Sequence, residues 1–280
     1  MRLGGPPMDD YDGPEEWRAA LERQGYAATS SPVGPDADDE TVRAYREAAE
    51  AADIAIAEVG AWGSNPLSTD EATRREAVAA CKRHLRLADD IGARCCVNIA
   101  GSRGDLWDGP HPDNFSEETV EQVVATVQEI IDDVDPETAT YSLEPMPWVV
   151  PDGPESYREL IERVDREAFG VHFDPVNMIS SPRRYADTAG FVREFVDELG
   201  TEIRCVHCKD IALRDNLTVH LDEVIPGEGN LDYRALLTAL DDLDRDIPLL
   251  VEHLDTAAEY EQAADHIRGV AEEVGVDLRP

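Results

Sequence analysis

The chain alternates short apolar segments with longer amphipathic ones, and this alternation restricts the fold more than any other feature. The short segments predict strands, and they cover residues 2–5, 26–30, 54–59, 94–99, 140–144, 171–174, 203–207 and 249–252. The segments between them have apolar residues at three- and four-residue spacing, which predicts helices. These helices cover residues 15–24, 39–52, 69–91, 117–132, 154–164, 186–199, 233–240 and 257–273. Eight strand–helix pairs in 280 residues predict a single-domain (β/α)₈ TIM barrel over residues 1–280.

An open, doubly wound α/β sheet is the alternative arrangement for such a chain. That fold often carries a glycine-rich phosphate-binding loop after its first strand. Here the first predicted strand runs into Gly-Gly-Pro-Pro, which matches neither G-x-G-x-x-G nor a Walker sequence. The count of eight pairs therefore favours the closed barrel.

The charge balance is strongly acidic. The chain has 61 acidic and 25 basic residues, a formal net charge of −36, and only two lysines, Lys82 and Lys209. The acidic residues are spread along the predicted helices, so the composition resembles that of halophilic proteins with solvated acidic surfaces. Nucleic acid is not expected as a partner, because phosphate binding relies on clustered basic residues.

Targeting and redox signals point to a cytoplasmic protein. No apolar run approaches the 18 residues of a membrane span, and the first ten residues do not read as a signal peptide. The five cysteines are an odd number and do not suggest a disulfide framework. Cys205 and Cys208 lie three apart on a predicted strand, so they should point to opposite faces and not share one metal. We expect both to be small buried thiols.

The last four predicted strands each end in a residue that can bind a metal. These are Glu144 in "YSLEP", Asp174 in "VHFDP", His207 in "CVHCK" and Glu252 in "LLVEHL". In a barrel the carboxyl ends of the strands form the rim where active sites are built, so these side chains should converge. Three carboxylates brought together would repel one another. A divalent cation would remove that repulsion, and three oxygens with one imidazole nitrogen suit Mn²⁺, Mg²⁺ or Co²⁺.

The motifs "LEPMP", "VHFDPVN", "VHCKDI", "VIPGEGNLDY" and "LLVEHL" together resemble the xylose isomerase-like TIM barrels, the sugar-phosphate isomerase/epimerase group. The resemblance implies one divalent metal, with Mn²⁺ preferred, held by Glu144, Asp174, His207 and Glu252. It also implies that Glu144 and Glu252 exchange protons with a small sugar or sugar acid. Removal of a proton beside a carbonyl gives an enediolate, and its reprotonation isomerises or epimerises the sugar.

Four further residues are candidates for substrate binding. His172 shares strand parity with Asp174, and Asn177 stands where some epimerases of this group carry a histidine, so D-tagatose or D-psicose specificity is not implied. Lys209 shares parity with His207, although an ion pair with Asp210 is the competing interpretation. Trp148 lies in the loop after the fifth strand and could cover a sugar ring.

Two other enzyme classes fit the same strand-end residues. Inosose dehydratases of this group would lose water from a cyclic polyol where an isomerase returns a proton. Endonuclease IV-type DNA-repair enzymes share the barrel, but they need three metals and further histidines, and this chain shows no basic groove. The sequence leaves a homo-oligomer open.

Overall fold

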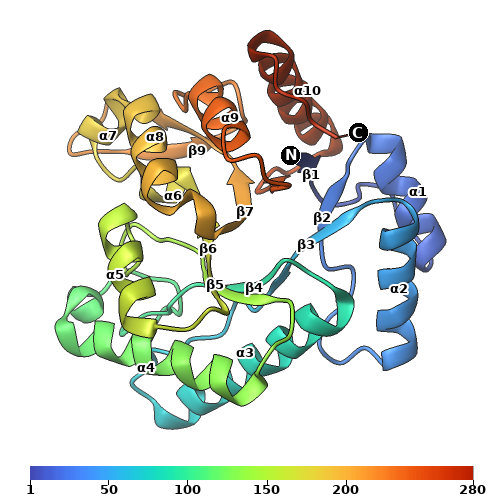
Figure 1. Ribbon diagram of the computed structural model, residues 1–280. Helices are drawn as coiled ribbons and strands as arrows, with labels where there is room; N and C mark the ends of the chain where they lie inside the picture. The colour runs from blue at the N-terminus through green and yellow to red at the C-terminus, as the bar shows by residue number, and fades with distance from the viewer. Residues whose placement is uncertain (280) are drawn as a thin grey trace.

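Eight parallel strands close into a barrel with the helices outside it, as the sequence predicts (Figure 1). The structure is a computed structural model and describes residues 1–279. Around the barrel the order is β1-β10-β7-β6-β5-β4-β3-β2. The barrel strands are β1 (Arg2–Gly4), β2 (Ala28–Ser30), β3 (Ala55–Gly60), β4 (Cys95–Asn98), β5 (Thr140–Leu143), β6 (Phe169–Phe173), β7 (Ile203–Cys208) and β10 (Pro248–Val251). Consecutive strands therefore lie side by side through most of the ring.

The helices match the predicted segments within a few residues. The long ones are α1 (Pro14–Gln24), α2 (Asp39–Ala51), α3 (Glu71–Ile91), α4 (Glu117–Val134), α5 (Pro154–Val164), α8 (Thr188–Leu199), α9 (Tyr233–Asp241) and α10 (Ala257–Val274). The short ones are α6 (Pro175–Met178), α7 (Pro182–Ala186) and the 3₁₀ turns η1 (Pro112–Phe115) and η2 (Gly200–Glu202). The third helix begins at Glu71 rather than at residue 69, because the side chain of Asp70 accepts a hydrogen bond from the Thr73 N–H and caps it.

The core has two layers, one on each side of the sheet. Most large apolar side chains pack between the outer face of the strands and the helices. The inner face carries a smaller apolar group, made of Ala28, Ala57, Cys95, Val97, Cys205 and Leu250. All five cysteines are free and buried, as expected for small core thiols.

A two-stranded hairpin that the sequence analysis did not predict follows β7. Its strands are β8 (Asp210–Leu213) and β9 (Leu221–Val224), which pair antiparallel. Asp210 is buried, and its carboxylate accepts backbone N–H bonds from Ile211, Gly227, Gly229 and Leu231 at 2.8 to 3.1 Å. Asp210 therefore holds the segment after the hairpin and is not the ion-pair partner of Lys209.

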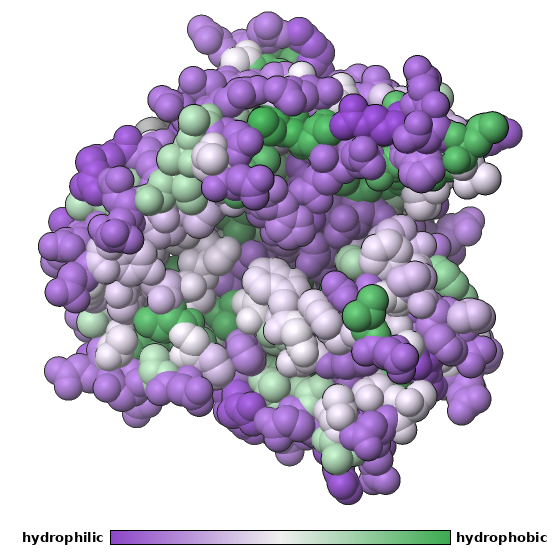
Figure 2. Space-filling model, turned by 180° about the vertical axis from the view of Figure 1, so that it is seen from behind, coloured by the Kyte–Doolittle hydropathy of each residue, from purple (hydrophilic) through white to green (hydrophobic). Residues whose placement is uncertain are grey.

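The surface is dominated by hydrophilic residues, and hydrophobic ones appear only in small groups on the face in Figure 2. Several acidic side chains pair with arginines one helical turn away, as in Arg46–Glu50 and Arg158–Glu162. Such exposed pairs each contribute little, at most about 1 kcal/mol. Among residues 1–279, none of the helices combines the length and apolar character needed to cross a bilayer.

Candidate metal and active site

The four strand-end residues converge at one end of the barrel. Glu144 directly follows β5, Asp174 follows β6, His207 lies in β7 and Glu252 follows β10. These four strands are neighbours in the ring, and one ligand atom from each residue lies within 4.8 Å of the other three. The arrangement is the one that the carboxyl ends of adjacent parallel strands produce.

His207 and Lys209 supply the positive side of this cluster. His207 Nδ1 lies 2.6 Å from Glu252 Oε1, 3.3 Å from Glu144 Oε1 and 3.7 Å from Asp174 Oδ2. Lys209 Nζ lies 2.6 Å from Glu252 Oε1 and 2.8 Å from Asp174 Oδ2. Lys209 is 1 % exposed, so its charge is directed at the carboxylates and not at solvent.

These contacts keep two of the carboxylates, Asp174 and Glu252, ionised despite their burial. Burial alone would raise the pKa of Glu252, but His207 and Lys209 outweigh it and lower that pKa to about 2. Burial opposes ionisation of Asp174 in the same way, and Lys209 and His207 reverse the effect and hold its pKa well below its usual range. Glu252 is thus ionised at neutral pH, with His207 and Lys209 balancing its charge.

The ligand atoms of the four strand-end residues fit a divalent cation. Asp174 Oδ2, His207 Nδ1 and Glu252 Oε1 are buried and lie close to opposite charges, yet none makes a hydrogen bond of acceptable geometry within residues 1–279. Buried polar atoms without such partners cost free energy, and here these three lie together with a fourth, Lys209 Nζ. Three carboxylates and one imidazole form the mixed oxygen and nitrogen set that Mn²⁺, Mg²⁺ and Co²⁺ accept.

Two neighbouring side chains fix the orientation of Glu144. Trp62 Nε1 donates to Glu144 Oε2 at 2.9 Å, and Asn177 Nδ2 donates to Oε1 at 3.2 Å. The indole lies directly over Gly60, where an added Cβ would be 1.8 Å from the Trp62 ring. Asn177 is itself positioned because its backbone N–H donates to Asp174 Oδ1 at 3.0 Å.

A pocket of about 530 Å³ opens next to the cluster. Glu144, Glu252 and Asn177 line it on one side, and Trp62 and Trp107 contribute aromatic surface. A volume of this order accommodates a small molecule, and the combination of apolar walls with a few convergent polar groups is typical of ligand sites.

The structure places the other predicted residues as follows. His172 is completely buried below His207, and its Nε2 lies 2.9 Å from Glu58 Oε2. His172 does not line the pocket. Trp148 donates its indole N–H to the carbonyl of Asp108 and joins two loops beside the pocket. Neither side chain is in the pocket wall, so the structure gives them supporting positions.

Sequence reasoning missed two residues of this region, Glu58 and His253. Glu58 lies on the inner face of β3 and contacts both His172 and His207. His253 lines the pocket with a φ of 58°, a conformation that non-glycine residues adopt at some cost and that clusters at functional sites. For Trp62 the sequence predicts a loop aromatic at the barrel mouth, which could cover a sugar ring or simply pack. Trp62 lines the pocket, and only its hydrogen bond to Glu144 could not be predicted. Of the two missed residues, only Glu58 could have been found from the sequence, because it is a carboxylate inside the apolar run "AIAEVG".

Comparisons with known proteins agree with this architecture. Residues 14–270 match the family model described as xylose isomerase-like TIM barrel. A search of curated protein sequences found no match.

Three solved structures illustrate the range of similar folds. D-psicose 3-epimerase from Clostridium cellulolyticum is 14% identical, with 96% of this chain and 99% of that chain covered and a TM-score of 0.68. A protein from Mycobacterium smegmatis, described as a xylose isomerase-like TIM barrel protein in complex with magnesium, is 15% identical. The match covers 94% of this chain and 90% of that chain, with a TM-score of 0.67. Endonuclease IV from Thermus thermophilus is 15% identical, with 98% of this chain and 100% of that chain covered and a TM-score of 0.74. At these identities the similarity establishes the fold.

Proposed function

Because the chain belongs to the xylose isomerase-like TIM barrel family, we propose that it is a divalent-metal-dependent isomerase or epimerase of a sugar or sugar acid. The observation that carries the proposal is a set of buried metal-ligand atoms on Asp174, His207 and Glu252 that make no hydrogen bonds to the residues that the structure describes. Glu144 completes this set, and the set lies beside a pocket of about 530 Å³. Sugar epimerases among the similar structures support the substrate class.

Glu144, Asp174, His207 and Glu252 would hold the cation, with Mn²⁺ preferred and Mg²⁺ or Co²⁺ as substitutes. When bound, it would supply positive charge that stabilises negative charge developing on substrate oxygens.

Glu144 and Glu252 are the acid/base pair of this proposal. Both line the pocket, and both are glutamates whose carboxylates reach the same small volume. Glu252 is ionised, and it would take the proton from a carbon beside a carbonyl, where the cation would stabilise the negative charge that develops. Glu144, whose carboxylate accepts hydrogen bonds from Trp62 and Asn177, would return a proton. Asn177, which lines the pocket, and Lys209, which is buried behind Asp174 and Glu252, would then contact substrate oxygens.

Lys209→Met is expected to raise KM for the substrate by about tenfold to a hundredfold with a smaller effect on kcat. A hydrogen bond from a charged donor contributes about 1.5 to 3 kcal/mol, and the methionine retains the apolar stem. Steady-state kinetics at saturating metal measures the effect. An unchanged KM would assign Lys209 to charge balance among Asp174, Glu252 and Glu144 alone.

A DNA-repair role is the competing function that the fold allows, since endonuclease IV has the same architecture. Nucleic-acid backbones are bound through excess positive charge. This chain has a net charge of −36, and Lys209, beside the pocket, is surrounded by carboxylates. The charge therefore favours a small-molecule substrate.

The experiment that tests the proposed isomerase or epimerase activity is exchange of a substrate hydrogen with solvent, because acid/base transfer at carbon requires it.

A further inference from the structure

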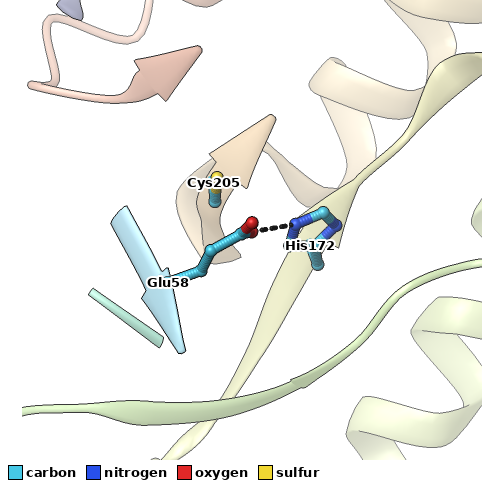
Figure 3. Close-up of side chains that lie close together, drawn as sticks. All are labelled: Glu58, His172 and Cys205. Carbon is cyan, nitrogen blue, oxygen red and sulfur yellow. Dashed lines mark hydrogen bonds and ion pairs between the residues drawn. The ribbon is translucent and has the colours of Figure 1, made fainter. Parts of the chain in front are cut away.

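A second polar cluster lies inside the barrel, directly beneath the four strand-end residues. It consists of Glu58 from β3, His172 from β6 and Cys205 from β7. Figure 3 shows the Glu58 carboxylate directed at the His172 ring, with Cys205 beside them. Glu58 is 1 % exposed and the other two are fully buried. A buried carboxylate costs several kcal/mol unless it is paired or hydrogen-bonded, so its presence needs a physical reason.

The contacts of Glu58 use both of its carboxylate oxygens. Oε2 lies 2.9 Å from His172 Nε2 and 3.2 Å from His207 Nε2. Oε1 lies 3.4 Å from His207 Nε2 and accepts the Ser30 hydroxyl at 3.1 Å. The carboxylate is therefore held between two imidazoles, whose rings are edge to face with centroids 4.1 Å apart.

An irregularity in the barrel turns Glu58 toward these imidazoles. Ala28 on β2 pairs with Ala55 on β3, but the register shifts after Thr29, so that Ser30 pairs with Glu58 and skips Ala57. A bulge of this kind reverses which face the following side chains occupy. Strict alternation would have placed Glu58 with Ile56, which packs in the outer apolar layer. The bulge is what brings the carboxylate inside.

The contact determines which nitrogen of His207 carries hydrogen. An ionised carboxylate only accepts hydrogen bonds, so His207 Nε2 must be the donor. When the ring gives up its second proton to bind a cation, the other nitrogen, Nδ1, carries the lone pair. That atom is the one that faces Glu144, Asp174 and Glu252 and has no hydrogen-bond partner within residues 1–279. Glu58 thus selects the tautomer that presents a ligand nitrogen to the carboxylates.

We infer that Glu58 is a positioning residue that orients His207 for cation binding, with His172 and Ser30 fixing the carboxylate. The inference rests on the proposed cation at the first cluster. A carboxylate behind a metal-binding histidine fixes the orientation of the ring and raises its basicity, and losing such a partner typically weakens metal affinity by about 10- to 100-fold. His172 supplies the second N–H donor that holds the carboxylate in line with His207.

The same three side chains could instead hold a second cation, because their ligand atoms also lie within 4.8 Å of one another. The hydrogen bonds argue against that use. Both oxygens of Glu58 already accept from Ser30, His172 and His207 at hydrogen-bond distance, and a cation would have to replace these donors. The two arrangements differ in the number of ions bound per chain.

Calorimetric titration of the metal-free full-length protein with Mn²⁺ in high salt tests the inference without any activity assay. The wild type should bind one ion, and Glu58→Gln should bind one ion about 10- to 100-fold more weakly. Cys205→Ser is the matched control, because it alters the same buried layer and leaves the side chains of Glu58, His172 and His207 unchanged. It should bind as the wild type does, within about twofold.

Four outcomes separate the alternatives. No binding by the wild type would contradict the proposed cation site itself. Equal affinity of the wild type and Glu58→Gln would overturn the positioning role while leaving the first site intact. Two ions per wild-type chain, with one lost in both Glu58→Gln and Cys205→Ser, would make Glu58 a ligand and overturn the inference. One ion with weakened binding in Glu58→Gln alone supports it.

The wild type alone gives an independent result should Glu58→Gln not fold. In the Zn²⁺-loaded protein, ¹⁵N-detected histidine spectra should show one ring with a metal-bound Nδ1 and a protonated Nε2. Its signal should disappear in His207→Gln, which assigns it. A metal-bound Nε2 on that ring would overturn the inference, because Nε2 is the atom that faces Glu58.

Discussion

Replacing Glu144 or Glu252 with glutamine is expected to lower kcat by about 10²- to 10⁴-fold while the protein stays folded. The magnitude is that of a lost general acid or base. Glutamine has nearly the same shape but cannot take up a proton. The fold should tolerate the change, because glutamine fills nearly the same space and His207 and Lys209 still pair with Asp174. Kinetics at saturating Mn²⁺ separates the loss of proton transfer from weaker metal binding.

Glu155→Gln is the matched control for both variants. Glu155 lies exposed in the first turn of α5, behind the same loop that follows Glu144, and the same chemical change there should leave kcat unaltered. The melting temperature of all three variants should remain within a few degrees of the wild type. Turnover at the wild-type rate in Glu144→Gln or Glu252→Gln would remove the acid/base assignment from that residue.

The second large effect concerns salt. Lowering the ionic strength from about 1 M to about 0.01 M lengthens electrostatic screening from about 3 Å to about 30 Å. With a net charge of −36, the repulsion among surface carboxylates then acts across much of the molecule. We expect the folded state to lose about 5 kcal/mol, which corresponds to a fall of roughly 10 to 20 °C in melting temperature for a chain of this length. Circular dichroism measures this.

Non-ionic solutes provide the control for the salt prediction. Sucrose stabilises proteins through exclusion from their surface but does not screen charge. Sucrose should therefore restore only a small part of the lost melting temperature, while NaCl and KCl of equal ionic strength should restore most of it. A melting temperature that does not respond to salt would show that the acidic surface is already balanced by local pairs such as Arg46–Glu50.

The barrel was predictable from sequence because its determinants are local. Each strand is a short apolar run and each helix carries an apolar stripe, so the eight pairs follow from periodicity alone. The prediction for α5 has the observed bounds of Pro154–Val164, and others differ by a residue or two at their ends. The hairpin β8–β9 was missed because its second strand is "LDEV", which alternates weakly and lies in a segment rich in polar residues.

The convergence of the four strand-end residues was also predictable, since parallel strands in a barrel bring their carboxyl ends together. The position of Glu58 was not. It depends on the register shift between β2 and β3, which follows from how two strands pair and is not encoded in the periodicity of either. The contacts of Trp62 and Asn177 with Glu144 likewise depend on loop conformations that only the folded chain defines.

Deuterium uptake from solvent tests the central claim most directly. Metal-loaded protein in D₂O and high salt would be incubated with a panel of ketoses, aldoses and sugar acids, and each compound followed by NMR, with Glu252→Gln as the blank. The account predicts deuterium at a carbon beside the carbonyl of at least one compound, and the product then distinguishes isomerisation, epimerisation and loss of water. Absence of exchange with every compound, by protein that has bound its metal, would contradict it.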